Sequence, residues 1–307
     1  MAGQVQTMVD TRRERKELGI RGRLTTPPGR GQDSPLKRAL IHLVLIIATI
    51  IVVFPVIRVF STSLRPGQNV LNPTLAIVPE GATLDAYWRV LTEYDLLNWL
   101  FNSLMVTVGT ATLGLIIAAT SAYGFSRYKF RARNGALTFL FATQLIPGIM
   151  LLVPIFIIYV QVGLVNSYQG LVFAYAVTAV PFSIWILKGY YDTIPFDLEE
   201  AAKIDGCTEF EAFRKVLLPL SMPALAIVFL LNFLAAWGEY FMARVLIGGR
   251  EELLTWPLGV QRFQAQFQTQ WADLSAASIL ISIPIVLLFV YISKYLVSGL
   301  TLGGIKG

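Results

Sequence analysis

Few residues of this chain have side chains suited to bond-making chemistry. Its 307 residues include one histidine, His42, and one cysteine, Cys207. A single cysteine forms no disulfide within the chain, and single residues of these types do not make a zinc site or the usual histidine-based acid–base catalyst. The GxxxxGK[ST] sequence that binds the phosphates of ATP is also missing. We therefore expect no catalytic residue, no metal site and no nucleotide-binding site in this chain.

One carboxylate is unusual because it lies within an apolar segment. Glu239 follows the sequence Ala-Ala-Trp-Gly, and an acidic side chain inside a membrane faces a cavity or a partner because its desolvation is costly. Two interpretations stay open: a structural ion pair with Arg244 or Arg58, or a role in a transport pathway or gate. The other candidate pathway residues are polar or aromatic groups of the kind that bind sugars, and helix packing accounts for them equally well: Asn232, Trp237, Tyr240 and Gln144.

The composition places these residues in a membrane protein. The chain is 55% hydrophobic and 14% charged, with a mean hydropathy of +0.62, whereas soluble domains are about a quarter charged. Apolar runs of roughly 20 residues match a hydrocarbon core of about 30 Å at 1.5 Å per helical residue. Six such runs predict an all-α polytopic membrane protein with six transmembrane helices: Ala39–Ile57, Leu104–Phe125, Ala136–Val160, Leu171–Leu187, Pro223–Met242 and Ala276–Val297.

Proline interrupts several of these runs, which membrane helices tolerate, often with a kink. Packing irregularity explains any single proline. The third run, however, combines Pro147 and Pro154 with Gly148. We therefore expect the third span to be bent and movable.

Basic residues predict the orientation of the spans, because loops rich in Lys and Arg stay in the cytoplasm. With both termini cytoplasmic, all but six of the 25 Lys and Arg residues lie inside. Residues 1–36 then form a disordered basic cytoplasmic tail, and 37–307 form the transmembrane domain. The net charge of +6 is thus explained by topology and does not indicate nucleic acid. The six outer basic residues are Arg58, Arg65, Arg89, Arg244, Arg250 and Arg262.

Two outer segments are long and rich in aromatic residues. Ser61–Phe101 includes an expected interfacial helical stretch at about Asp85–Trp99, and Gly248–Asp273 contains two tryptophans and two phenylalanines. Aromatic residues gather at membrane interfaces in any case. A docking surface for an extracytoplasmic partner and an ordinary interfacial belt are both open interpretations.

The cytoplasmic segment 188–222 predicts two short helices joined by a tight corner. The first begins at about Asp197, with acidic residues at its electropositive start. Gly206 then occupies a position where a left-handed residue ends the helix, which costs glycine little. The expected apolar face of this helix is Leu198, Ala201 and Ala202, with Ile204 next to them.

The second short helix begins with Thr208, and Glu211 three positions later completes a capping box. Phe210 and Phe213 belong to its apolar stripe, and Pro219 ends it or turns it toward the membrane. Composition alone slightly favours another interpretation, an amphipathic hairpin lying on the membrane surface.

The order of residues in this segment resembles a known family. Glu-Ala-Ala at 200–202, Gly206, and Val-Leu-Leu-Pro at 216–219 are similar to the EAA loop of ABC-importer permeases, written EAA-x3-G-x9-I-x-L-P. The one departure is Val216 in place of Ile. The resemblance implies that this loop docks on a cytoplasmic ATPase subunit and transmits its motion. The implied coupling residues are Glu200, Ala201, Ala202, Asp205, Gly206, Phe210, Phe213, Leu218 and Pro219.

The resemblance extends from about Lys37 to Gly307, over nearly all of the chain beyond the basic tail. Asn102-Ser103 and the sequence AYGFSR at 122–127 are similar to carbohydrate permeases of the type I ABC-importer class. The terminus is similar to the smaller permease subunit of maltose-type importers, in which the tail reaches into the ATPase dimer. A glycine-rich end is otherwise more often disordered. The implied docking residues of the tail are Gly303, Gly304, Lys306 and Gly307.

These observations lead us to expect a permease subunit of an ATP-driven sugar importer in the cytoplasmic membrane of a prokaryote, with maltose or a malto-oligosaccharide as the cargo. The family implies four kinds of partner: a second permease, an ATPase dimer that binds ATP and Mg, an extracytoplasmic sugar-binding protein, and membrane lipid. An ion-coupled secondary transporter is the alternative, although it would favour several buried acids and inverted repeats. A membrane enzyme is the third class, and no constellation of residues supports it.

Overall fold

The computed structural model describes residues 35–67, 76–264 and 269–303. Within these ranges the chain is helical, and its only β pairing is an isolated bridge between Gln264 and Thr269. The chain divides into two units, Met1–Ser61 and Thr62–Gly307. The predicted all-α architecture is confirmed for the described residues.

The first unit consists, where it is described, of the long helix α2 (Pro35–Ser63), whose last residues enter the second unit. Its 29 residues correspond to a length of about 44 Å at 1.5 Å per residue. The apolar window of this helix is buried nowhere within the chain. Its side chains therefore face lipid or a partner, as the hydropathy of the run predicts.

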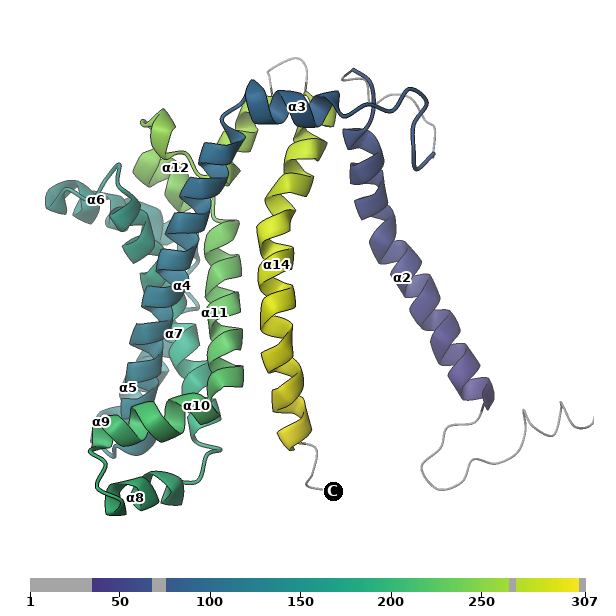
Figure 1. The fold of residues 1–307 in the computed structure, drawn as a ribbon. Coiled ribbons are helices and arrows are strands. Elements are labelled where there is room, and N and C mark those ends of the chain that lie inside the picture. The colour runs from purple at the N-terminus through teal and green to yellow at the C-terminus, as the bar shows by residue number, and fades with distance from the viewer. Residues whose placement is uncertain (1–34, 68–75, 265–268, 304–307) are drawn as a thin grey trace, which may run out of the picture. The chain divides into compact units, whose positions relative to one another are not determined.

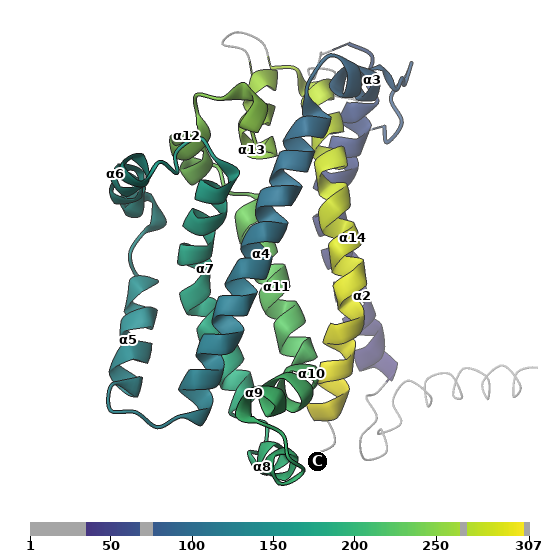
Figure 2. The same cartoon turned by 60° about the vertical axis from the view of Figure 1, so that its left-hand side comes forward.

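The second unit is a helical bundle in which α4 (Leu96–Arg127), α7 (Tyr168–Tyr191) and α11 (Met222–Trp237) pack together (Figures 1 and 2). The helix α14 (Trp271–Gly303) packs against α11 and against α3 (Asp85–Thr92). The remaining elements are α5 (Arg133–Thr143), η1 (Gly148–Leu151), α6 (Leu152–Val162), α8 (Asp197–Ile204), α9 (Glu209–Ala212), the π-helical turn η2 (Phe213–Leu217), α10 (Leu218–Leu220), α12 (Phe241–Ile247), η3 (Glu251–Leu253), α13 (Trp256–Gly259) and η4 (Val260–Phe263).

Small side chains allow α4 to approach its neighbours closely, as is common between membrane helices. Its buried positions include Ala111, Gly114, Ala118 and Ala122. A Cβ atom at Gly114 would lie 3.0 Å from Nδ2 of Asn232 on α11. The close contact between α4 and α11 therefore depends on the missing side chain at this position.

Short elements occupy both ends of this bundle. One end holds α8, α9 and α10, and the opposite end holds α3, α12 and α13 (Figures 1 and 2). We call these the α8 end and the α3 end. At the α3 end, the guanidinium group of Arg89 on α3 donates to the carboxylate of Asp273 on α14, with Nη2 at 2.6 Å from Oδ1. The side-chain amide of Asn102 donates to the carbonyls of Glu252 and Leu254, at 2.9 and 3.0 Å.

Four described helices are long and apolar enough to cross a membrane, and the number rises to six if each of two bent pairs is one span. The predicted six spans are therefore reached only with those pairs included. One pair is Arg133–Thr143 with Gly148–Val162, bent by 97°, and the other is Glu209–Leu220 with Met222–Trp237, bent by 79°. Since Glu209–Leu220 contains four charged residues, we take Met222–Trp237 as the part of the second pair that enters hydrocarbon.

Three predicted segments differ in the structure. The third run is broken between Thr143 and Gly148, which confirms the expected bend but divides the span into nearly perpendicular halves. The fifth run ends at Trp237, and a separate helix, α12, begins after Gly238. The stretch predicted at Asp85–Trp99 is two elements, because α3 ends at Thr92 and Trp99 belongs to α4. Apolar residues lie on both sides of the first two breaks, so a hydropathy pattern does not reveal them, whereas Glu93 and Asp95 lie at the third break.

Candidate functional site

The corner between α8 and α9 forms as its local sequence predicts. Gly206 adopts a φ of +92° with open space around its Cα, as a left-handed helix end requires. Thr208 and Glu211 form the capping box in both directions. The ammonium group of Lys215, the backbone N–H of Thr208 and the hydroxyl of Thr208 all contact the Glu211 carboxylate and lower its pKa to about 2.

The helix α8 turns a charged residue inward. Glu199 is 0% exposed and Ala202 is also buried, whereas Leu198 is 45% exposed and Ile204 is 87% exposed. Most of the expected apolar face, Leu198, Ala201 and Ile204, is therefore exposed, and the inward position belongs to Glu199 and Ala202. The physical reason is a cation from another helix that draws the carboxylate of Glu199 inward.

That cation is Arg127, the last residue of α4. Its Nε donates to Oε1 of Glu199 at 2.6 Å, and the side chains are 8% and 0% exposed. Its Nη1 donates to the carbonyl of Tyr191 at 3.0 Å, and its Nη2 donates to the carbonyl of Ile194 at 3.2 Å. One guanidinium group thus joins the end of α4 to the end of α7, to the connection after it and to α8.

The next residue holds the second short helix. The hydroxyl of Tyr128 donates to Oε2 of Glu209 at 2.6 Å, and Nζ of Lys203 on α8 donates to Oε1 at 3.1 Å. The hydrogen bond from Tyr128 and then the one from Lys203 lower the pKa of Glu209. Phe213 is buried against the ring of Tyr123, with the ring centroids 4.7 Å apart, and Phe210 is 66% exposed.

The α8 end therefore exposes a patch with three large apolar side chains on a rigidly held corner. We define the coupling face as seven exposed residues of α8, of the corner after it and of α9: Leu198, Glu200, Ala201, Ile204, Asp205, Gly206 and Phe210. Among the other predicted coupling residues, Ala202 and Phe213 are buried, Leu218 is half-buried and Pro219 is exposed. Gly303 ends α14, and Gly304, Lys306 and Gly307 lie outside the described residues.

Glu239 has a structural partner other than the predicted arginine. Its Oε1 accepts the backbone N–H of Met242 at 2.9 Å, and its Oε2 accepts that of Ala243 at 3.0 Å. The carboxylate therefore caps the N-terminus of α12, where unpaired N–H groups and the helix dipole favour a negative charge. No ion pair joins it to Arg244 in the described part of the chain, and Arg58 belongs to the other unit.

The other candidate pathway residues do not converge on one site. Trp237 is buried, and its ring stacks on that of Phe233 with the centroids 5.4 Å apart. Tyr240 is half-buried beside Phe241. Gln144 is exposed on another helix pair, where its amide donates to a backbone carbonyl. Only Asn232 shares a cavity with Glu239.

That cavity has a volume of about 40 Å³ and lies among α4, α7 and α11, with Thr110 and Tyr175 also in its wall. Oδ1 of Asn232 accepts the Ser183 hydroxyl at 2.9 Å. Among the described residues, Nδ2 of Asn232 and Oγ1 of Thr110 have no hydrogen-bond partner although both side chains are buried. Thr110 and Tyr175 were not predicted, because nothing in the sequence distinguishes them from packing residues of apolar helices.

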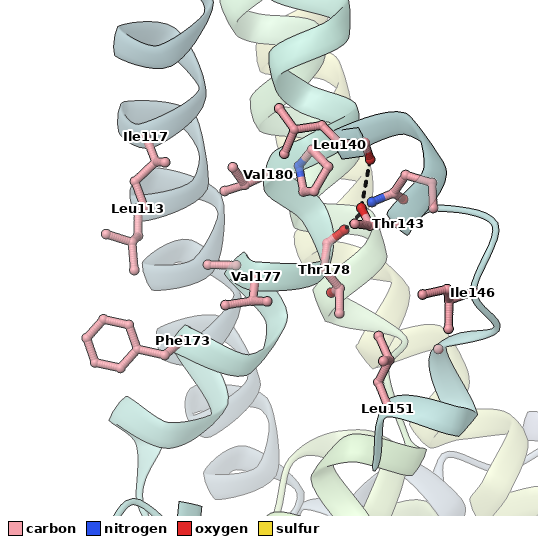
Figure 3. Close-up of a pocket in the computed structure, with 14 residues that line it drawn as sticks. Leu113, Ile117, Leu140, Thr143, Ile146, Leu151, Phe173, Val177, Thr178 and Val180 are labelled. Atoms are coloured by element: carbon pink, nitrogen blue, oxygen red, sulfur yellow. Dashed lines mark hydrogen bonds between the residues drawn. The ribbon is translucent and has the colours of Figure 1, made fainter. Parts of the chain in front are cut away.

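A larger groove of about 690 Å³ is lined by α4, α7, the end of α5 and η1, beside the break between α5 and η1 (Figure 3). Leu113 and Ile117 approach it from α4, while Phe173 and Val177 approach it from α7. Its polar lining consists of Thr143, Gln144 and Thr178. A groove with so few polar groups does not offer the hydrogen bonds that a hydroxyl-rich ligand requires.

The described ranges contain no group of three or more His, Cys, Asp and Glu side chains placed to hold a metal ion. The bundle instead combines membrane-spanning helices with a short, firmly anchored helix pair at one end. This combination defines a polytopic membrane protein with a short helix pair exposed at one end.

Residues 97–301 match the family described as the inner membrane component of binding-protein-dependent transport systems, and the chain belongs to that family. It is 34% identical to the maltose/maltodextrin transport system permease of Vibrio parahaemolyticus, over 84% of this chain and 92% of that one. It is 33% identical to the maltodextrin permease of Bacillus subtilis, over 89% and 97%, and 35% identical to the diacetylchitobiose uptake permease of Streptomyces coelicolor, over 83% and 92%.

A solved structure agrees with this assignment. A chain of a bacterial ABC transporter involved in the import of the acidic polysaccharide alginate superimposes with a TM-score of 0.74, at 25% identity, over 88% of this chain and 99% of that one. The predicted membership of the ABC-importer permeases is therefore confirmed. The chain is a multi-pass inner membrane transport subunit and not an enzyme.

Proposed function

We propose that the chain is one permease subunit of an ATP-driven importer that moves a sugar across the cytoplasmic membrane of a prokaryote. Maltose or a malto-oligosaccharide is the proposed cargo. The names of the relatives support a carbohydrate, since they refer to maltose, maltodextrin and diacetylchitobiose. The proposed assembly contains a second permease, an ATPase dimer that binds ATP and Mg, and an extracytoplasmic sugar-binding protein.

The observation that carries this proposal is the coupling face. Leu198, Ile204 and Phe210 are large apolar side chains exposed beside charged residues, at an end where a lipid environment is unsuitable for those charges. Burial of one such side chain against a partner contributes about 1.5–3 kcal/mol. Gly206 carries no side chain and keeps the corner narrow. A narrow apolar corner suits insertion into a cleft of the ATPase.

The proposed orientation places the α8 end in the cytoplasm. Basic residues support it, because Arg127, Lys188 and Lys203 lie at this end, together with Arg133 and Lys215. The opposite end has fewer basic residues, among them Arg89, Arg250 and Arg262. A cytoplasmic surplus of Lys and Arg is the usual determinant of orientation. The basic tail 1–36 and the C-terminal tail 298–307 are then cytoplasmic too, and we propose that the latter contacts the ATPase through Gly303, Gly304, Lys306 and Gly307.

The break between α11 and α12 is the proposed gate. Glu239 holds the start of α12, Trp237 and Tyr240 flank the break, and Asn232 lies two turns below in α11. We assign these four residues to the hinge rather than to sugar contacts, because their polar groups and rings are directed into the chain's own packing. Movement of the coupling face changes the tilt of α11, and the capped break lets α12 follow or remain in place.

Affinity purification from the native membrane tests this function. The chain is extracted in mild detergent, and the co-purified proteins are identified by mass spectrometry. We expect an ATPase with a phosphate-binding loop and a second polytopic permease. Recovery of the chain alone, with transport intact, would contradict the proposal.

Uptake measurements separate the importer from an ion-coupled transporter. Labelled maltose uptake is measured in cells that lack the co-purified ATPase, and separately in cells whose ion gradients have been dissipated while ATP is maintained. The proposal expects uptake to stop in the first case and to continue in the second. The reverse result would indicate a secondary transporter.

A further inference from the structure

The sequence AYGFSR at 122–127, which ends α4, contains a residue that the proposed function leaves unexplained. Arg127 lies at the α8 end but does not belong to the coupling face, because its side chain is only 8% exposed. Its contacts all lie within the chain. The question is therefore what a buried cation does beneath a docking surface.

Every nitrogen of the guanidinium group donates to a different structural element. Nε donates to Glu199 on α8 at 2.6 Å, Nη1 to the carbonyl of Tyr191 at 3.0 Å, and Nη2 to the carbonyl of Ile194 at 3.2 Å. Nη1 also donates to the hydroxyl of Ser126 at 3.2 Å, and the guanidinium carbon lies 5.8 Å from the centre of the Phe196 ring. Since a guanidinium group is planar and its donors are fixed, these contacts define the direction of α8 as well as its distance.

Stability alone does not explain a buried ion pair. Two charges removed from water lose hydration that their attraction only partly replaces, so apolar residues of similar size are often as stabilising or better. The pair does fix the distance and direction between its two side chains, and apolar contacts fix these less closely. In this chain the fixed geometry lies between the helix that carries the coupling face and two helices of the central bundle, α4 and α7.

We propose that Arg127 is a positioning residue that transmits the movement of α8 to the ends of α4 and α7. This inference rests on the proposed function, because it assumes that an ATPase moves α8. When α8 is displaced, Glu199 displaces the guanidinium group, and the carbonyls of Tyr191 and Ile194 move with it. Tyr128 forms the parallel link from α4 to α9 through Glu209, but that carboxylate is exposed and therefore gives a looser connection.

The experiment uses the complete importer, purified with its ATPase and sugar-binding protein and reconstituted in liposomes. Four forms of the chain are compared: wild type, the double variant Arg127→Met/Glu199→Met, Arg127→Lys, and the control Lys215→Met. The control removes a partner from the exposed pair between Lys215 and Glu211 in the same loop, with Nζ and Oε1 2.8 Å apart. For each form we measure ATPase recovery, ATP hydrolysis and sugar uptake per ATP hydrolysed.

The double variant removes both charges and keeps the volume, so we expect it to fold and to retain the ATPase. Its uptake per ATP is expected to fall about tenfold or more, within the range of typical coupling energies. Arg127→Lys retains the charge but not the fork of donors, and an intermediate value is expected. The control Lys215→Met is expected to show the same sugar uptake per ATP as the wild type.

Wild-type uptake per ATP in the double variant would overturn the inference, because the ion pair between Arg127 and Glu199 would then have no role in coupling. If the double variant is not recovered, Arg127→Lys decides: it keeps the charge but loses the fork of donors, and unchanged uptake per ATP in this variant would also overturn the inference. The proposed function fails separately, when no ATPase is recovered with the wild-type chain. Retained ATPase with unchanged coupling in every variant rejects the role of Arg127 alone.

Discussion

Two polar regions of the bundle are built in opposite ways. At the α8 end, the guanidinium group of Arg127 directs its donors to four oxygens, and the apolar side chains of α8 point outward. In the cavity among α4, α7 and α11, Oγ1 of Thr110 and Nδ2 of Asn232 are buried and lack partners among the described residues. The first region joins several elements through charge-assisted hydrogen bonds, although Oε2 of Glu199 is buried without a partner among the described residues, and the second region has no such bonds at these two atoms.

The difference indicates what each region can do. A network of charge-assisted hydrogen bonds in a low-dielectric interior resists displacement, because any movement leaves a charge or a carbonyl unpaired. Unpaired groups lose nothing when their helices shift, and they can gain a partner in another arrangement. The α8 end is therefore suited to transmitting movement as a rigid element, and the cavity beside the α11–α12 break is suited to accommodating it.

The largest expected effect comes from breaking the buried pair on one side. Glu199→Leu leaves the Arg127 cation buried without its carboxylate, and we expect a loss of about 3–5 kcal/mol in the free energy of unfolding. The measurement is the thermal denaturation midpoint of the purified chain in detergent. Glu251→Leu is the matched control: its ion pair with Arg262 has the same 2.6 Å length but is exposed, so the expected loss is below about 1 kcal/mol. Equal losses in the free energy of unfolding for Glu199→Leu and Glu251→Leu would contradict the claim that burial makes the first pair the more costly one to break.

The second effect concerns the corner. Gly206→Asp places a charged side chain on a residue with a φ of +92° at the centre of the coupling face. We expect normal insertion but a drop in ATPase co-purification of about 100-fold, because the added group blocks the cleft and is desolvated on docking. Gly163→Asp introduces a similar strain at a φ of +71° in open space at the end of α6 and should leave ATPase recovery unchanged. Full recovery with Gly206→Asp would exclude the corner from the docking surface.

A smaller effect is expected from one exposed ring. Phe210→Ala removes an apolar group that is 66% exposed on the coupling face. We expect the affinity for the ATPase to fall about tenfold, as for a moderate interface contact, while the thermal midpoint of the isolated chain stays constant. Phe139→Ala removes a ring that is equally exposed but lies on α5, and it serves as the control in a titration of the ATPase. Equal affinities for both variants would show that Phe210 makes no contact.

The smallest effect tests the cavity. Thr110→Val removes a buried hydroxyl that has no partner while keeping the shape of the side chain, so we expect the free energy of unfolding to change by less than about 0.5 kcal/mol. Ser183→Ala removes the donor to Oδ1 of Asn232 in the same region, and a loss of about 1 kcal/mol is expected. Thermal midpoints of the two variants in one detergent provide the comparison. A larger loss for Thr110→Val would mean that its hydroxyl is bonded.

Local signals account for what the sequence predicted well. The capping box of Thr208 and Glu211 and the left-handed Gly206 involve contacts within three residues, so spacing and residue type determine them. The outline of the spans follows from hydropathy in the same way. The long motif at 200–219 identified the family, although the positions of its residues in space were not implied by it.

The orientation of α8 was not predictable by the same means. Glu199 is inside because Arg127, 72 residues earlier, draws it there, and helical periodicity does not single out this carboxylate from the other acidic residues of α8. The end of α11 at Trp237 was missed because apolar residues continue on both sides of Gly238 and Glu239, so the run was extended through them. Its cap at Glu239 depends on hydrogen bonds to N–H groups three and four residues later, while the sequence suggested an ion pair.

The most direct test of the central claim uses the single cysteine, Cys207, which follows Gly206 at the corner and is partly exposed. Inside-out and right-side-out membrane vesicles are treated with a membrane-impermeant maleimide, with the ATPase either bound or removed. The account predicts labelling of the chain only in inside-out vesicles, and protection when the ATPase is bound. Labelling in right-side-out vesicles, or labelling that is unaffected by the bound ATPase, would contradict it.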